Sequence, residues 1–297
     1  SSAASDVYKR QVSESGSWTT DFCYVNHELR EGSAPMTCGL PTAYGGDMTL
    51  VVTLRDAAAE LELRLFYTTY PAEDVITRRA ELRCLRGYVN LKKLMSLSLD
   101  LAERELVMTT FTGGWICEAH RQDRAVKGTL INESRTGFSS NRANPGFILS
   151  ERGADEQRGR VWGFNLVYSG GHMSCVSGDE HGSVRVMCGI SPDRFEWRLE
   201  GGESFETPEA VMCFSADGFG GMSRAMHDFV NRRIVRGRWA GRGRPVLVNA
   251  WEGFMFDFDA KRLLSLAKRA KTIGAELFVM DDGWFAGRDD DTGGLGD

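Results

Sequence analysis

Two adjacent aspartates, Asp281 and Asp282, stand directly after a short apolar run near the end of the chain. Trp251 ends an earlier apolar run, and Trp284 follows the aspartates. Carboxylates accept hydrogen bonds from hydroxyl groups, and an indole face packs against the C–H side of a pyranose ring. Together these residue types indicate a sugar-binding site. The aspartates could equally cap a helix or bind a metal ion, with the tryptophans in a core, and spacing alone does not separate these interpretations.

Two predicted strands must position these side chains. The run 245–251 is continuously apolar over the length of a strand, as expected for a parallel strand buried on both faces, and 276–280 is a second such run. Between them Asp259 is a good N-cap, an apolar helical stripe follows, and Gly274 suits the end of a helix. Strand, helix and strand predict a βαβ unit that opens a doubly wound sheet or a (β/α)8 barrel.

The longer preceding part of the chain has the period of half-buried strands. Apolar residues alternate in 60–67 and 160–168, and turn signals such as Gly201-Gly202 recur at close spacing. This pattern predicts an antiparallel β-sandwich. From Met222 to Ile234 the period becomes that of an amphipathic helix, which we expect to connect the two domains.

The boundaries of the expected domains follow from these changes of pattern. Residues 1–11 match nothing downstream and look like a translated sequencing adapter, so we expect them to be a non-native leader outside the fold. Residues 12–220 are predicted to form the β-sandwich domain. Residues 221–244 are expected to be a linker helix and a basic, solvated connection. Residues 245–297 are predicted to be the start of a barrel domain.

Composition excludes several classes of protein. The 297 residues are 42% hydrophobic and 26% charged, with a formal net charge of -5, so the chain lacks the basic patch of a nucleic-acid-binding protein. No stretch approaches 18 apolar residues, and the first residues lack the basic and apolar regions of a signal peptide, so we expect neither a membrane span nor a secretion signal within this chain. The seven cysteines are odd in number and widely spaced, which indicates free thiols and a cytoplasmic location.

Several long tracts of the sequence resemble one family. The tracts 245–259, 276–285 and 288–292 are similar to the barrel entry of family 36 α-galactosidases. The resemblance extends over about residues 15–297 through five upstream tracts, which are 39–44, 74–78, 137–145, 163–170 and 207–210. It implies a mainly β fold: an antiparallel β super-sandwich followed by a linker helix and the first βαβ unit of a (β/α)8 TIM barrel, truncated after two of the eight strands.

The resemblance also implies an activity and a set of site residues. The family hydrolyses terminal α-galactosides such as melibiose or raffinose with retention, using no cofactor and no metal, and its members often form homotetramers. Asp281 and Asp282 match the aspartate pair that binds galactose hydroxyls, and Trp251 matches a tryptophan of the same subsite. The nucleophile and the acid/base of the family are aspartates on later barrel strands, which are expected beyond Asp297. This chain is therefore expected to hold substrate-binding residues without the catalytic pair.

Other functions fit the same residues. An α-N-acetylgalactosaminidase or a galactosyl transferase could use the same scaffold, because the pockets for the acceptor and the 2-substituent are expected outside this chain. A non-catalytic carbohydrate-binding module could be built on the sandwich alone. The tract Asp281–Phe285 favours the enzyme over the binding module.

Overall fold

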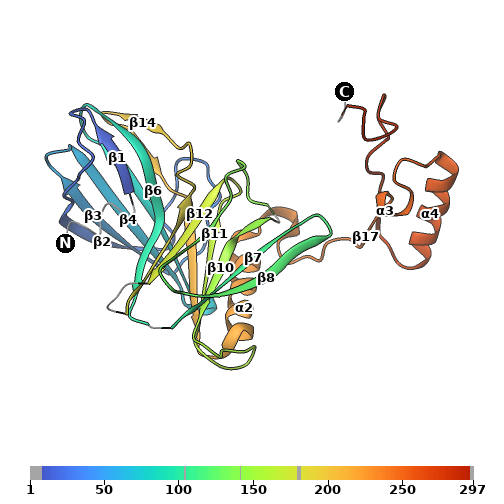
Figure 1. The fold of residues 1–297 in the computed structure, drawn as a ribbon, viewed down its shortest axis with the longest axis horizontal. Helices are drawn as coiled ribbons and strands as arrows, with labels where there is room; N and C mark the ends of the chain where they lie inside the picture. The colour runs from blue at the N-terminus through green and yellow to red at the C-terminus, as the bar shows by residue number, and fades with distance from the viewer. Residues whose placement is uncertain (1–8, 104, 141, 179–181, 295–297) are drawn as a thin grey trace. The chain divides into compact units, whose positions relative to one another are not determined.

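The computed structural model describes residues 9–103, 105–140, 142–178 and 182–294. The chain divides into two compact units, Ser1–Val235 and Arg236–Asp297, and each has its own architecture. The first is built almost entirely of antiparallel strands (Figure 1). The second contains a short parallel strand pair and two helices.

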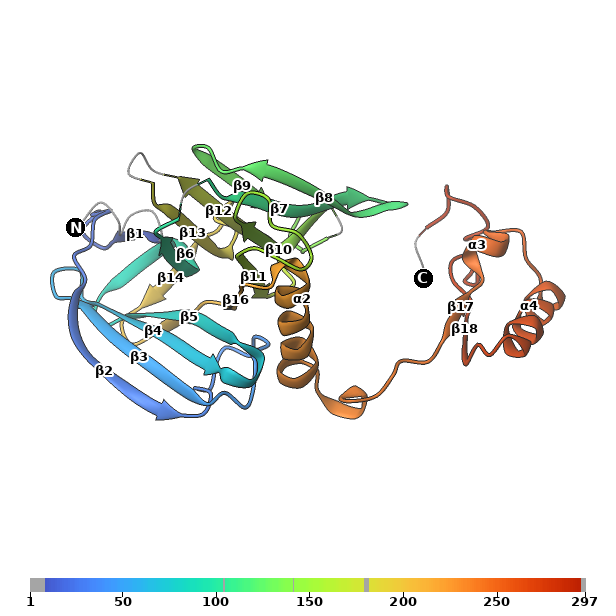
Figure 2. The ribbon, with the colours of Figure 1, turned by 90° about the horizontal axis from the view of Figure 1, so that it is seen from below.

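Two antiparallel sheets make up the first unit, as Figure 2 shows from below. The six-stranded sheet has the order β1-β6-β13-β12-β9, with β14 also paired to β6. Its strands are β1 (Lys9–Ser13), β6 (Tyr88–Leu101), β9 (Thr129–Glu133), β12 (His172–Gly178), β13 (Val184–Ile190) and β14 (Trp197–Glu200). The ten-stranded sheet has the order β2-β3-β4-β5-β16-β11-β10-β7-β8, with β15 paired to β5. Its strands are β2 (Cys23–Glu31), β3 (Met48–Asp56), β4 (Leu61–Tyr70), β5 (Val75–Cys84), β7 (Val107–Gly114), β8 (Cys117–Ala125), β10 (Ala143–Ser150), β11 (Val161–Val167), β15 (Ser204–Glu206) and β16 (Glu209–Ser215).

The core of the sandwich is formed by alternate residues of facing strands. Leu97 and Val186 of the six-stranded sheet pack in one cluster with Met108, Phe147 and Phe164 of the ten-stranded sheet. The rings of Phe147 and Phe164 stack with their centroids 4.8 Å apart. Because every second side chain of a strand faces the same side, the alternation in the sequence is sufficient to build this core. The predicted antiparallel sandwich is confirmed.

The helix α2 (Gly218–Phe229) packs on the other face of the ten-stranded sheet and continues as a π-helical turn, Val230–Ile234. Met222 and Phe229 are buried in a cluster with Val161 and Val211. Gly163 permits this close approach, since a Cβ there would lie 2.6 Å from the Met222 sulfur. The ten-stranded sheet thus covers the apolar stripe of the predicted helix, which belongs to the first unit and precedes the connection to the second.

The expected leader is also partly inside the fold. β1 pairs with β6, with Lys9 opposite Leu94 and Gln11 opposite Leu91, and the Lys9 and Gln11 side chains are buried. The expectation that residues 1–11 lie outside the fold is therefore wrong for 9–11, whereas 1–8 lie outside the described residues. An edge strand offers backbone groups that can pair with almost any extended segment, so an unmatched sequence does not prevent pairing.

The second unit is the predicted βαβ unit, with shorter strands than expected. β17 (Leu247–Asn249) and β18 (Leu277–Val279) pair in parallel, and α3 (Trp251–Phe254) and α4 (Ala260–Thr272) lie between them in sequence. The Asp259 side chain caps α4 by accepting a hydrogen bond from the Arg262 amide. β17 ends at Asn249 because Trp251 already begins a helix. None of the helices in the described part of the chain is long and apolar enough to cross a membrane.

Candidate functional site

The carboxyl ends of β17 and β18 bring Asn249 and Asp281 together. Asn249 Nδ2 donates a hydrogen bond to Asp281 Oδ2 at 2.5 Å, and Asn249 Oδ1 accepts one from the Trp251 amide at 2.9 Å. Parallel strands end at the same edge of a sheet, so residues 32 positions apart in sequence become neighbours. The Asp281 side chain is otherwise exposed, and a carboxylate has room for further hydrogen bonds.

Asp282 has a different and more crowded environment. Arg288 Nε lies 3.1 Å from both carboxylate oxygens of Asp282, and Arg288 Nη2 donates to Oδ2 at 2.8 Å. The Gly283 amide donates to Oδ1 at 2.8 Å. The hydrogen bonds from Arg288, followed by the one from Gly283, hold the pKa of Asp282 below its ordinary value despite some opposing desolvation. Asp282 is therefore a carboxylate at neutral pH and is unsuited to donate a proton.

Aromatic rings connect these two carboxylates to Trp251. The Trp251 and Phe256 rings meet edge to face with centroids 4.9 Å apart. The Arg288 guanidinium lies 5.3 Å from the centroid of the same Phe256 ring. The three residues predicted to bind the sugar, Asp281, Asp282 and Trp251, are thus joined in one cluster through Asn249, Phe256 and Arg288.

The turn after β18 depends on a glycine. Gly283 has φ +82°, and a Cβ at this position would lie 3.0 Å from Phe256 Cδ1 and 3.3 Å from Phe258 Cε1. Any other residue would meet both the strain of a positive φ and these two rings. The next residue, Trp284, is 63% exposed and contacts Phe285 edge to face.

Sequence reasoning missed Arg288 and Phe256. Arg288 lies in the tract 288–292 that resembles the family, but the sequence pattern assigns it no role. In the structure Arg288 is 5% exposed. Its signal in the sequence is a cation six residues after a carboxylate, in a segment with glycines, where a turn can bring the two together. Among the described residues, no group of three or more His, Cys, Asp and Glu side chains could hold a metal ion.

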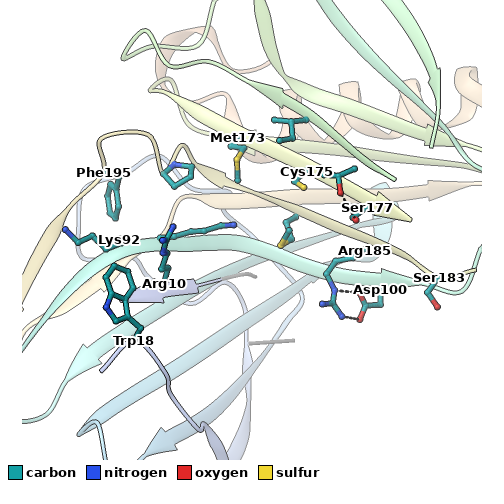
Figure 3. A pocket seen from close by; sticks show the side chains of 15 residues that line it. Arg10, Trp18, Lys92, Asp100, Met173, Cys175, Ser177, Ser183, Arg185 and Phe195 are labelled. Atoms are coloured by element: carbon teal, nitrogen blue, oxygen red, sulfur yellow. Dashed lines mark hydrogen bonds and ion pairs between the residues drawn. The ribbon is translucent and has the colours of Figure 1, made fainter. Parts of the chain in front are cut away.

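A cavity with a volume of about 850 Å³ lies over the six-stranded sheet of the first unit (Figure 3). Its lining includes Trp18, Met173 and Cys175. Its one carboxylate, Asp100, is already paired with Arg185 through two hydrogen bonds of 2.7 and 2.8 Å. This cavity does not offer the paired hydroxyl acceptors that the strand ends of the second unit provide.

Comparison with known proteins agrees with both units. The model of the glycosyl hydrolase family 36 N-terminal domain matches residues 8–200, and the melibiase model matches residues 204–297. The chain therefore belongs to glycosyl hydrolase family 36.

Individual relatives of the chain are named as α-galactosidases. The chain is 40% identical to α-galactosidase AgaA of Geobacillus stearothermophilus, over 98% of this chain and 40% of that protein. It is 38% identical to α-galactosidase C of Emericella nidulans, over 95% of this chain and 38% of that protein. A crystal structure of an AgaA variant in complex with stachyose superposes with a TM-score of 0.90, at 38% identity over 96% of this chain and 40% of that one. The chain spans about 40% of the length of these relatives.

Proposed function

We propose that the protein to which this chain belongs is an α-galactosidase that releases terminal α-galactosyl residues with retention. The observation that carries the proposal is the cluster of Asp281, Asp282 and Trp251 at the carboxyl ends of two parallel strands. Barrel enzymes bind their substrates at that end of the strands. The proposal is supported by relatives named as α-galactosidases along nearly the whole of this chain.

In this proposal the two aspartates accept hydrogen bonds from hydroxyls of the galactosyl unit. Asp281 is exposed apart from its bond to Asn249, and Asp282 is held as a carboxylate by Arg288. Trp251, packed edge to face on Phe256, supplies an apolar wall for the C–H side of the ring. These groups bind and orient the sugar.

The proposal assigns bond cleavage to two further carboxyl groups. Retaining hydrolysis needs a nucleophile and an acid/base about 5 to 5.5 Å apart. The hydrogen bonds from Arg288 lower the pKa of Asp282, which disfavours Asp282 as the acid. We therefore assign the catalytic pair to residues outside this chain, and the relatives, of which the chain spans about 40%, have the length to hold them.

The test compares the full-length protein with the 297-residue chain on p-nitrophenyl α-galactoside and raffinose. We expect the full-length protein to release galactose and the chain alone to release none. The matched α-N-acetylgalactosaminide measures the alternative specificity, and a β-galactoside serves as the control. Faster hydrolysis of the α-N-acetylgalactosaminide would contradict the galactosidase assignment. Turnover by the chain alone would contradict the assignment of the catalytic pair.

A further inference from the structure

The two neighbouring aspartates are held by very different numbers of donors. Asp281 accepts one described hydrogen bond, from a neutral amide. Asp282 accepts three contacts from one guanidinium and a fourth from a backbone amide. Asp281 can adjust its rotamer at little cost, whereas Asp282 is fixed on both oxygens.

Arg288 is itself held in place from three sides. Its Nη1 donates to the Gly293 carbonyl at 3.0 Å, Phe256 lies against its guanidinium, and its Nη2 also reaches Asp291 at 3.5 Å. The side chain is 5% exposed, so water competes little for its donors. A planar guanidinium matches the geometry of a carboxylate, which a lysine ammonium cannot reproduce. Arg288 therefore holds the Asp282 carboxylate in a fixed orientation.

We propose that Arg288 is a positioning residue for the sugar site: it fixes the orientation and the charge of Asp282, so that Asp282 is the rigid acceptor and Asp281 the adaptable one. This inference rests on the proposed function, because it assumes that Asp282 accepts a hydrogen bond from the substrate. Arg288 itself does not contact the sugar. Its effect on binding passes through the Asp282 carboxylate.

The surrounding charges determine how removal of Arg288 affects the pH dependence. Asp281 is adjacent in sequence, and Asp290 and Asp291 both act on the Arg288 charge. Without the guanidinium, Asp282 would lose the cation that its carboxylate contacts, while the acidic residues Asp281, Asp290 and Asp291 would remain in the same segment. Like charges disfavour ionisation, so the pKa of Asp282 would rise. A substrate hydroxyl needs the ionised acceptor, so sugar binding would then weaken at a higher pH than in the unchanged protein.

The experiment measures galactose binding to the full-length protein by calorimetry between pH 4 and pH 7. The variants are Arg288→Gln, Arg288→Lys, Asp282→Asn and the double variant Arg288→Gln/Asp282→Asn. We expect Arg288→Gln to weaken galactose binding about tenfold at pH 7. We also expect it to move the acid limb of the binding profile, the pH range in which binding is lost on acidification, to higher pH. Arg288→Lys should keep the acid limb near its original pH but still weaken binding, because the charge remains and the bidentate geometry is lost.

The double variant separates positioning from a general structural role. If Arg288 acts through Asp282, the double variant should bind galactose no more weakly than Asp282→Asn alone. Losses of galactose affinity that add up in the double variant would overturn the inference. An Arg288→Gln protein with an unchanged acid limb of binding and a lower melting temperature would also overturn it. If Arg288→Gln does not fold, an affinity of Arg288→Lys equal to that of the unchanged protein would overturn it. A full-length protein that neither binds galactose nor hydrolyses α-galactosides would instead contradict the proposed function.

Discussion

Asp281 and Asp282 are neighbours in the same turn, but different groups surround their carboxylates. An amide from the neighbouring strand end holds Asp281, and a buried guanidinium from the following loop holds Asp282. The residue types and their place after a short apolar run could be recognised in the sequence. Their partners could not, because the Asn249 contact depends on parallel pairing and the Arg288 contact depends on the course of a loop without regular structure. Local periodicity in the sequence predicts neither of these two contacts.

A second residue-scale feature is the buried His172 in β12. It is 1% exposed, its Nε2 lies 2.9 Å from the Ala143 carbonyl, and its Nδ1 has no hydrogen-bond partner among the described residues. Burial lowers the pKa of His172, and the bond to Ala143 offsets only part of this effect. The neutral ring is therefore the form that the folded state favours.

This lowered pKa predicts a pH-dependent stability. Below about pH 6.5 the unfolded chain binds a proton that the folded chain resists, so the free energy of unfolding should fall as the pH falls. We expect the urea midpoint of the 297-residue chain, followed by its β-sheet circular dichroism, to decrease from pH 7.5 to pH 5.5. His172→Gln keeps a donor for Ala143 and should flatten this dependence. His227→Gln, at an exposed helix position, is the matched control. An equal slope in His172→Gln would refute the explanation.

At the scale of elements, periodicity in the sequence predicts where helices and strands lie, but it does not predict which elements pack against them. The stripe from Met222 to Ile234 identified a helix, but an apolar stripe does not say which surface covers it. In the structure the ten-stranded sheet does so, with Gly163 making the space. The predicted strand 245–251 was too long because continuous apolar character also suits the first turn of α3. Helix ends with explicit signals were better defined, as at Asp259.

The segment that follows α2 should be the first point of proteolysis. Residues 236–244 contain a single 3-10 turn, Gly237–Trp239, and four arginines that are all exposed, Arg236, Arg238, Arg242 and Arg244. We expect trypsin to cut here before it cuts the sandwich, since strands paired on both sides resist local unfolding. Mass spectrometry of a time course identifies the first cut. Replacing the four arginines by glutamine should delay it. A first cut within the paired strands of the sandwich would contradict this division of stability.

At the scale of the whole chain, tracts far apart in sequence meet at one buried carboxylate of the first unit. Glu209 accepts hydrogen bonds from the Thr42 hydroxyl, the Ala43 amide and the Thr77 hydroxyl, at 2.9, 2.7 and 2.7 Å. Three of the tracts that carry the family resemblance, 39–44, 74–78 and 207–210, therefore converge on one buried carboxylate. Periodicity predicted a mainly β domain and the resemblance implied the start of a barrel, whereas this polar network depends on contacts 132 to 167 residues apart.

The central claim is that Asp281 and Asp282 bind the galactosyl unit. The most direct measurement is kcat/KM for p-nitrophenyl α-galactoside, with the melting temperature, in full-length Asp281→Asn and Asp282→Asn proteins. Asparagine keeps the shape but replaces one acceptor by a donor, so kcat/KM should fall by roughly 10- to 100-fold while the melting temperature changes little. Asp289→Asn, at an exposed position in the same loop, should leave both values unchanged. Unchanged kcat/KM with a clear fall in melting temperature in both variants would show that the aspartates brace the loop and do not bind the sugar.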